Sequence, residues 1–224
     1  MDKISIRSGR VVSEKGKLYT VTEYPKIVYG ERITKSGKKS LRTWEPKRSK
    51  LSAAIRNGLR NFPFLEDSSV LYLGASTGTT VSHISDICSE GMIFAVEFSM
   101  EPFSKLLELS KDRQNIYPVF STARSPENYS LFIEHDPEII YQDISQKDQL
   151  RILLTNMQAF PGWNYAMLML KAISIDSSRN PEAVMREQEA LLRKERNISI
   201  LETVNIGNFH RGHFCIVMKN NHIS

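Results

Sequence analysis

The segment 70–98 contains the residues whose types and spacing most clearly indicate ligand chemistry. The stretch VLYLGASTGTTVSH places Gly74 and Gly78 between an apolar run and the start of a helical pattern. A glycine turn there lets backbone N–H groups approach a ligand, and the helix N-terminus favours negative charge. The spacing is G-x-x-x-G and not the G-x-G-x-x-G of pyrophosphate binders, so alone it indicates only a nucleotide-like ligand. A plain turn with a helix cap is the alternative.

Glu97 strengthens the nucleotide hypothesis. It ends the stretch AVEF, about 20 residues past the glycine turn, at the expected carboxyl end of a strand. A carboxylate there can accept hydrogen bonds from ribose hydroxyls. An exposed surface glutamate is the alternative, and the apolar neighbours Ala95, Val96 and Phe98 argue against it.

The turn 121–126, with the sequence STARSP, follows the next expected strand. Loops at the carboxyl edge of such a sheet line the crevice in which a ligand lies. Phe98, Thr122 and Ala123 are therefore candidates to face an adenine ring, and plain loop packing is the alternative.

From about residue 50 onward the pattern alternates between strands and helices. Asn180 and Pro181 supply an N-cap and a first-turn proline for the last helix, which runs to about residue 196. Repeated strand–helix units predict a doubly wound α/β fold. Strands are expected at 70–74, 92–98, 115–120, 138–142 and 165–171, and helices at 79–88, 100–111, 147–160 and from 181.

The C-terminal end breaks this alternation. Residues 198–206 and 213–219 are strand-like and are joined by a short loop with no helix. A mostly parallel sheet that ends in an antiparallel hairpin favours a class I S-adenosylmethionine methyltransferase, which is Rossmann-like, over a dinucleotide oxidoreductase. The missing G-x-G-x-x-G also disfavours the oxidoreductase.

Residues 1–49 differ in pattern from the rest. Short β-type runs at 17–24 and 26–33 alternate with turn residues at 14–16 and 36–37, which predicts a small antiparallel β unit. We therefore expect a small β-rich domain over 1–49 and a methyltransferase domain over 50–224.

The charge distribution favours an anionic partner. The net charge is +5, and the stretch 35–50 carries many basic residues against the single acid Glu45. A phosphate backbone suits such a run, because each neutralised phosphate releases counterions. A solvated basic loop is the alternative. The basic residues are Lys35, Lys38, Lys39, Arg42, Lys47, Arg48 and Lys50.

The composition argues against several other classes of protein. No stretch approaches the roughly 18 to 20 apolar residues of a membrane span, and MDKISIRSGR has no apolar core of a secretory signal. We expect a cytoplasmic protein without a membrane partner. Cys88 and Cys215 lack metal-ligand spacing, so we expect buried free thiols and no metal site.

Five motifs together resemble the fibrillarin family. They are WxPxRSKL at 44–51, YLGASxGTTVSHxSDI at 72–87, AVEFS at 95–99, ARxP at 123–126 and DxxQxxQ at 143–149. The match at 72–87 is too long and specific to be chance. The Gly/Arg-rich N-terminal extension of eukaryotic members is absent, so the chain resembles the short, archaeal-type form.

The resemblance implies a small N-terminal sheet domain followed by a class I methyltransferase domain. It implies transfer of the methyl group of S-adenosyl-L-methionine to ribose 2′-hydroxyls of rRNA, and in archaea also of tRNA, at guide-paired sites. The implied partners are a C/D guide RNA, the substrate RNA, a scaffold protein and a kink-turn-binding protein. The candidate cofactor-binding residues are Gly74, Ala75, Thr79, Thr80, Glu97, Phe98, Thr122, Ala123, Asp143 and Gln146.

Thr122 departs from the family pattern. Members usually have Asp before the ARxP motif, where it contacts the adenine amino group. The hydroxyl of Thr122 can still accept a hydrogen bond there, but it lacks the charge of a carboxylate. The departure motivates an alternative function, in which the chain is a scaffold subunit of an RNA complex with weakened or lost cofactor binding.

Related 2′-O-methyltransferases use a Lys-Asp-Lys set completed by an acidic residue or His, and the matching positions are Lys50, Asp143, Lys171 and His213. Asp143 and Lys171 end the fourth and fifth expected strands, so both lie at the ligand-bearing edge. Partial desolvation after the apolar run 166–170 would make Lys171 a proton acceptor, which Asp143 would orient. Lys50 would steer the hydroxyl or neutralise a phosphate, and His213 would complete the hydrogen-bond network.

Each of these residues has a structural alternative. The alternative for Lys171 is a strand-end lysine whose stem is buried while its charge reaches solvent. The alternative for Asp143 is an N-cap of the following helix, and that for Lys50 is one more phosphate contact of the basic run. His210 competes with His213 for the fourth position. His83 is expected to be packed on the first helix and not to be catalytic.

Overall fold

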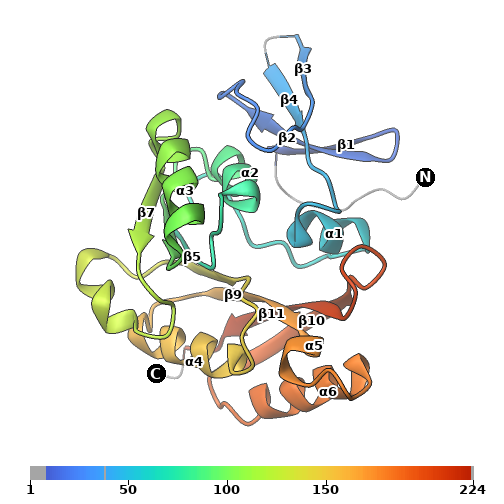
Figure 1. The fold of residues 1–224 in the computed structure, drawn as a ribbon, viewed down its shortest axis with the longest axis vertical. Coiled ribbons are helices and arrows are strands. Elements are labelled where there is room, and N and C mark those ends of the chain that lie inside the picture. Colours follow the sequence, from blue (N-terminus) through green and yellow to red (C-terminus); the bar gives the residue numbers. More distant parts are fainter. Residues whose placement is uncertain (1–8, 38, 223–224) are drawn as a thin grey trace.

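The structure, a computed structural model, describes residues 9–37 and 39–222 and contains two β-sheets (Figure 1). The smaller sheet is made of β1 (Val11–Glu14), β2 (Lys17–Thr22), β3 (Ile33–Ser36) and β4 (Lys39–Thr43). The larger sheet is made of β5 (Val70–Leu73), β6 (Ile93–Glu97), β7 (Ile116–Phe120), β8 (Ile139–Gln142), β9 (Tyr165–Lys171), β10 (Ile198–Asn205) and β11 (His213–Asn220). Their strand orders are β1-β2-β4-β3 and β10-β11-β9-β8-β5-β6-β7.

The direction of the strands confirms the predicted fold class. Strands β7, β6, β5, β8 and β9 are parallel, whereas β11 lies between β9 and β10 and is antiparallel to both. Every residue of β5 and β8 is buried, as expected for parallel strands that are covered on both faces. The molecule is thus a class I methyltransferase-like α/β fold with a C-terminal hairpin and a separate antiparallel N-terminal sheet.

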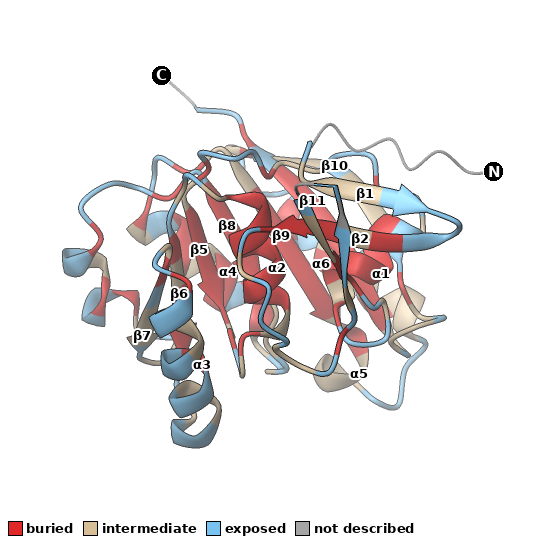
Figure 2. Ribbon diagram, turned by 90° about the horizontal axis from the view of Figure 1, so that it is seen from above, coloured by how far each residue is buried: buried red, intermediate tan, exposed pale blue. Residues whose placement is uncertain are grey.

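Helices cover both faces of the larger sheet (Figures 1 and 2). Tyr72 packs in one core with Leu51 and Val81, whereas its neighbour Leu71 packs on the opposite face with Leu153. Side chains alternate in this way because successive residues of a strand point to opposite faces. The helices are α1 (Lys50–Arg56), α2 (Thr79–Ile87), α3 (Met100–Asp112), α4 (Gln149–Ala159), α5 (Ala172–Ile175) and α6 (Pro181–Leu192), with 3-10 turns at Pro126–Asn128 and Ser130–Phe132.

Helices α2, α3, α4 and α6 confirm the four predicted helices, although α6 ends at Leu192 and not near residue 196. Asn180 caps α6 as expected, because its side chain accepts hydrogen bonds from the N–H groups of Glu182 and Ala183. The seven-residue helix α1 was not predicted, and Ser49 is its N-cap. In the described ranges, no helix is both long and apolar enough to cross a membrane.

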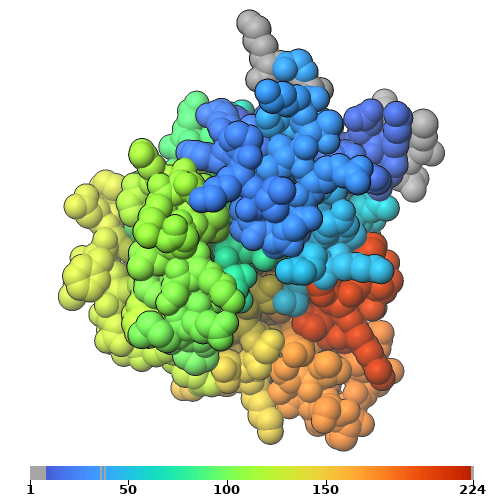
Figure 3. Space-filling view, turned by 45° about the horizontal axis from the view of Figure 1, so that its top comes forward, coloured from blue at the N-terminus to red at the C-terminus, as the bar shows by residue number. Residues whose placement is uncertain are grey.

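The N-terminal sheet departs in part from the prediction. Residues 17–22 form β2 as expected, but the predicted strand at 26–33 is wrong, because residues 23–32 form a loop. The Glu31 carboxylate accepts hydrogen bonds from the N–H groups of Val28 and Tyr29, which are therefore not available to a strand ladder. The division of the chain at 49/50 stays a prediction. In Figure 3 the blue N-terminal residues lie against the green surface of α3.

A buried cluster around Asp86 joins this sheet to α2. The carboxylate of Asp86 accepts hydrogen bonds of 2.7 Å from the hydroxyls of Thr20 and Thr22 and from the guanidinium of Arg113. The guanidinium of Arg42 lies 3.1 Å from the same carboxylate. Since Asp86 is on α2 while Thr20, Thr22 and Arg42 are on β2 and β4, one carboxylate connects both sheets through these elements.

Arg42 belongs to the basic run that was expected to face a phosphate backbone, and for this residue the expectation is wrong. Its side chain is fully buried, lies 3.4 Å from the Glu31 carboxylate and donates to the Ser82 hydroxyl at 2.9 Å. Two guanidinium groups therefore face two carboxylates inside the protein, which is the pairing that buried charges require.

His83 is packed beside this cluster, as predicted. Its Nδ1 lies 2.8 Å from the Thr20 hydroxyl, and its ring stacks on Trp44 with the centroids 5.0 Å apart. The single hydroxyl hydrogen of Thr20 is donated to Asp86, so Nδ1 of His83 carries a proton and donates to Thr20. Burial, and then the two nearby guanidinium charges, lower the pKa of His83 well below its usual value, which keeps the ring neutral.

Cys88 and Cys215 are free and fully buried, which confirms the prediction for both thiols. Burial raises the pKa of each thiol, so neither is a thiolate nucleophile at neutral pH.

The Asp86 cluster makes a prediction about stability. Asp86→Asn should lower the free energy of unfolding by about 3 to 5 kcal/mol, because it leaves buried guanidinium charges without their shared carboxylate. The measurement is urea unfolding. The matched control is Asp112→Asn, which breaks the exposed Lys26–Asp112 pair and should cost far less. Equal, small losses for the two variants would show that the cluster does not hold the sheets together.

Candidate functional site

A cleft of about 410 Å³ opens at the carboxyl edge of the larger sheet. Loops that follow β5, β6, β7 and β8 surround it, on both sides of the point between β5 and β8 where the strand order reverses. Ligands of doubly wound sheets bind at such a point. The lining residues are Gly74, Ser76, Glu97, Phe98, Ser99, Pro102, Thr122, Ala123, Arg124, Asp143, Ile144, Ser145, Gln146 and Ile152.

Gly74 is required where β5 turns into the cleft. Its φ is +84°, and a Cβ atom on it would lie 2.5 Å from the carbonyl oxygen of Asp143 and 2.6 Å from Cγ2 of Ile144. The N–H groups of Gly74 and Ala75 both donate to the carbonyl of Val96 at 3.0 Å. The absent side chain thus lets the loops after β5 and β8 meet at the base of the cleft.

Glu97 is 7% exposed, so the alternative of a surface glutamate is wrong. Its carboxylate accepts hydrogen bonds from the N–H groups of Ser76 at 2.8 Å, Phe98 at 3.0 Å and Ser99 at 2.8 Å. These bonds fix the carboxylate between the glycine turn and the end of β6, where it lines the cleft. A carboxylate held in place by three amides still has acceptor capacity for a ribose hydroxyl.

Thr122, Ala123 and Phe98 all line the cleft, and Phe98 is 61% exposed. That they face an adenine ring stays a prediction. Beside them lies Arg124, which the sequence reasoning did not single out although it belongs to the ARxP motif. Its guanidinium donates to Gln146 at 3.2 Å and forms an ion pair with Asp148. The hydrogen bond from Arg124 lowers the pKa of Asp148 to about 2.

Three predicted cofactor residues do not line the cleft. Ala75 and Thr80 are buried and Thr79 is partly buried. The Thr80 hydroxyl donates to the hydroxyl of Ser49 at 3.0 Å, so it connects α2 to the cap of α1. A cofactor role for these three residues stays a prediction.

Lys50 and Asp143 form an ion pair at the edge of the cleft. The Lys50 ammonium donates to Asp143 Oδ1 at 2.7 Å and to Oδ2 at 2.9 Å, and both side chains are largely buried. Asp143 follows β8 directly, and its N–H donates to the carbonyl of Leu73 at 2.9 Å. It does not cap the following helix, because α4 begins at Gln149 with Asp148 as its N-cap.

His213 lies directly opposite Lys171 on the neighbouring strand. The N–H of Ala172 donates to the carbonyl of Gly212, which makes Lys171 and His213 a non-hydrogen-bonded pair, the arrangement with the closest side chains. The Nδ1 of His213 is 2.9 Å from the carbonyl of Arg211, so Nδ1 carries the proton and Nε2 is free to accept one.

His210 is also close to this group, but it is half-buried in the loop before β11. Its Nε2 donates to the carbonyl of Pro46 at 2.8 Å, and its ring is 5.9 Å from that of His213. The structure thus brings Lys50, Asp143 and both histidines to one region, and only His213 is paired across the sheet with Lys171.

Lys171 is the last residue of β9 and is partly buried. It shares a sheet face with Met167 and Met169, which belong to the core that α1 and α2 cover. Within the described ranges its ammonium has no hydrogen-bond or ion-pair partner, whereas its backbone is held by Gln149. Gln149 is the last residue of the DxxQxxQ motif, and the sequence reasoning assigned it no role.

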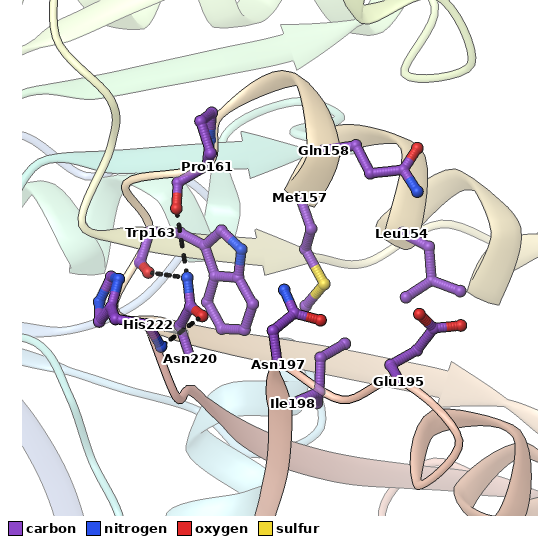
Figure 4. A pocket seen from close by; sticks show the side chains of 10 residues that line it. All are labelled: Leu154, Met157, Gln158, Pro161, Trp163, Glu195, Asn197, Ile198, Asn220 and His222. Atoms are coloured by element: carbon purple, nitrogen blue, oxygen red, sulfur yellow. Dashed lines mark hydrogen bonds between the residues drawn. The ribbon is translucent and has the colours of Figure 1, made fainter. Parts of the chain in front are cut away.

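A larger depression, of about 550 Å³, opens at the opposite edge of the sheet, around Trp163 and Met157 (Figure 4). It contains no glycine turn and none of the residues predicted to bind cofactor or substrate. Parallel strands do not present their carboxyl ends there, so we assign the site to the smaller cleft. In the described part of the chain, no three His, Cys, Asp or Glu side chains are grouped as metal ligands.

Electrostatic contact between Lys50 and the histidines can be measured. Burial is the main reason why the pKa values of His213 and His210 lie below the usual 6.5, and the Lys50 charge adds to that lowering, whereas Asp143 opposes it. Lys50→Ala removes the cation and leaves Asp143, so both imidazoles should titrate at higher pH. NMR titration measures this shift, with the exposed Lys47→Ala as the control. Unchanged midpoints in Lys50→Ala would contradict this geometry.

Comparison with known proteins gives consistent matches. A model of the fibrillarin family matches residues 9–222. The chain is 46% identical over 209 residues to the fibrillarin-like rRNA/tRNA 2′-O-methyltransferase of Thermoplasma volcanium, covering 93% of this chain and 92% of that protein.

Two solved structures are also similar. A chain of a fibrillarin/Nop5p complex has a TM-score of 0.85 at 40% identity, covering 94% of this chain and 97% of its own length. Aeropyrum pernix fibrillarin, solved with natively bound S-adenosyl-L-methionine, has a TM-score of 0.82 at 34% identity, covering 93% and 92%. Since the family model spans almost the whole sequence and the fold agrees, the chain belongs to the fibrillarin family.

Proposed function

We propose that this protein is an S-adenosyl-L-methionine-dependent RNA methyltransferase that modifies ribose 2′-hydroxyls of rRNA and tRNA at guide-paired sites. The observation that carries the proposal is the Lys50–Asp143 ion pair at the edge of a nucleotide cleft, beside the strand ends that hold Lys171 and His213. The names of its relatives support the same activity and the same methyl donor.

The residues of the cleft fit the cofactor. Its volume of about 410 Å³ lies within the range of about 300 to 1,000 Å³ that is usual for small-molecule sites. Glu97 would bind the ribose hydroxyls, and Phe98, Thr122 and Ala123 would contact the adenine ring. Gln146, which lines the same cleft, would contact its polar edge. When bound, S-adenosyl-L-methionine supplies an activated methyl group on a sulfonium.

The protein's own residues would then align the substrate and remove one proton. Lys50, fixed by Asp143, would bind the 2′-oxygen or the adjacent phosphate, which places the oxygen in line with the methyl carbon. As the oxygen bonds to that carbon and the bond from the carbon to sulfur breaks, the hydroxyl proton would pass to the Nζ of Lys171, which accepts it as the neutral amine. Asp143 would orient both lysines, and His213, with a free Nε2, would complete the hydrogen-bond network.

The remaining basic run supports an RNA partner. Lys35, Lys39, Lys47 and Arg48 are exposed, unlike the buried Arg42, and Arg48 lies over the ring of Tyr29. Lys47 and Arg48 directly precede the cap of α1, so they can contact phosphates next to the target ribose. We propose that a C/D guide RNA selects the target. The fibrillarin/Nop5p complex supports a scaffold partner, and we propose a kink-turn-binding protein in the same assembly.

A second candidate function is an RNA-complex scaffold with weak or no cofactor binding. Thr122 favours it, because its hydroxyl already accepts a 3.3 Å hydrogen bond from the N–H of Arg124 and lacks the charge of the aspartate expected there. Calorimetry with S-adenosyl-L-methionine separates the two functions. No binding at millimolar cofactor would contradict the methyltransferase proposal.

The assigned roles predict the activity of single variants in a reconstituted complex with guide-paired RNA. Lys171→Ala should lower the rate of methyl transfer by about 10²-fold or more, since it removes the proton acceptor. Asp143→Ala should also lower it, because both lysines lose their orienting carboxylate. Transfer of labelled methyl is measured, with Lys219→Ala, exposed at the opposite edge, as the control. Full activity in both site variants would show that the assignment is wrong.

Thr122→Asp tests the adenine end of the cleft. A carboxylate is a stronger acceptor than a hydroxyl, so the variant should bind S-adenosyl-L-methionine roughly fivefold more tightly, from about 1 kcal/mol of added hydrogen-bond energy. Calorimetry gives the Kd, and S-inosylmethionine, which lacks the adenine amino group, is the control ligand. Equal gains for both ligands, or no gain, would place the adenine amino group elsewhere.

A further inference from the structure

The side chain of Gln149 is bonded to both backbone groups of Lys171. Its Oε1 accepts a hydrogen bond from the N–H of Lys171 at 2.9 Å, and its Nε2 donates to the carbonyl of Lys171 at 3.1 Å. Gln149 is fully buried at the first turn of α4. Its own carbonyl accepts a 2.7 Å hydrogen bond from the side chain of Gln142, the last residue of β8.

The strand pattern explains why Lys171 needs these bonds. The N–H of Ala172 points to β11, where it meets the carbonyl of Gly212. Backbone groups of successive strand residues point to opposite sides, so those of Lys171 point toward β8. The pairing of β8 with β9 ends at Gln142 and Leu168, which leaves no strand opposite Lys171. The amide of Gln149 occupies the place that a further residue of β8 would take.

We infer that Gln149 is a positioning residue for the reaction, which it serves by holding Lys171 at the end of β9. The inference rests on the proposed function of Lys171. Two hydrogen bonds to one residue fix the backbone from which its long, flexible side chain extends. On its other side Lys171 is paired with His213, so the strand end is held from both edges. The Nζ amine can then reach the substrate hydroxyl from a fixed origin.

Asn156 offers a matched comparison on the same helix. It is also fully buried, and it follows Gln149 by seven residues, which places both amides on one face of α4. Its Nδ2 donates to the carbonyl of Ala123 at 2.8 Å, at the end of the cleft assigned to adenine. One helix thus holds the two ends of the site through two buried amides, one toward the substrate and one toward the cofactor.

The test compares Gln149→Met with Asn156→Leu in the reconstituted complex with guide-paired RNA and S-adenosyl-L-methionine. Gln149→Met keeps the volume and removes both bonds to Lys171, together with a 3.0 Å bond from Nε2 to the carbonyl of Gln146. The loss of the bonds to Lys171 should lower kcat about 10- to 100-fold, the cost of a small misplacement of a reacting group. The Kd for the cofactor should change less than kcat, because only the backbone of Gln146 loses a bond on the cofactor side. Asn156→Leu should instead raise the Kd for the cofactor and change kcat less. Wild-type kcat in Gln149→Met would overturn the inference.

Gln149→Glu provides a second variant if the methionine variant does not fold. A neutral carboxyl group can accept from the N–H of Lys171 and donate to its carbonyl, whereas a carboxylate can only accept. The ratio of variant to wild-type kcat should therefore rise as the pH is lowered. A ratio that does not change with pH would contradict the inference.

Amide hydrogen exchange separates this inference from the proposed function. The N–H of Lys171 should exchange slowly in the wild type and faster in Gln149→Met, whatever the protein catalyses. If the wild-type complex transfers no methyl group, the proposed function fails, and the exchange rates still report on the contact. If the wild type is active, the positioning role fails in either of two cases: the N–H of Lys171 still exchanges slowly in Gln149→Met, or that variant keeps full activity.

Discussion

The carboxylate of Asp86 is buried between the two sheets, where it is bonded to Thr20, Thr22 and Arg113 and paired with Arg42. Those contacts hold β2 and β4 on α2, and the chain that leaves β4 carries the ring of Trp44 onto His83. The same segment ends at Ser49, which caps α1 and accepts a hydrogen bond from Thr80 of α2. Lys50 is the next residue. Its ion pair with Asp143 therefore depends on a carboxylate outside the cleft.

The larger sheet imposes the complementary constraint. Parallel strands direct their carboxyl ends to one edge, so Gly74, Glu97 and Asp143 converge although they are far apart in the sequence. Uncharged amides hold the residues at this edge in place. Backbone N–H groups fix the Glu97 carboxylate, and the buried side-chain amides of Gln149 and Asn156 hold the backbone of Lys171 and Ala123. The charged groups are fixed as well, since Lys50 is paired with Asp143 and Glu97 is bonded to the loop after β5. Such preorganisation suits a reaction whose main demand is alignment.

Most strands and helices of the larger sheet could be predicted from the sequence, because the strands are apolar runs and the helices have local caps such as Asn180. The loop at 23–32 could not, since the hydrogen bonds that Glu31 accepts depend on its local folding and not on strand propensity. The burial of Arg42 could not either, because its partner Asp86 is distant in the chain. The Lys50–Asp143 pair spans 93 residues, and only the family motifs pointed to it. Gln149 stood in a recognised motif, yet its contact with Lys171 depends on where β8 ends.

The proposed reaction of this site is the transfer of a methyl group to a ribose oxygen. The most direct measurement locates the transferred group, by mass spectrometry of nucleosides from a guide-paired RNA incubated with the reconstituted complex and labelled S-adenosyl-L-methionine. Label is expected on the 2′-oxygen of one guide-paired nucleotide, and none is expected when that nucleotide is a 2′-deoxynucleotide. Label on a base, or equal labelling of the deoxy substrate, would contradict it.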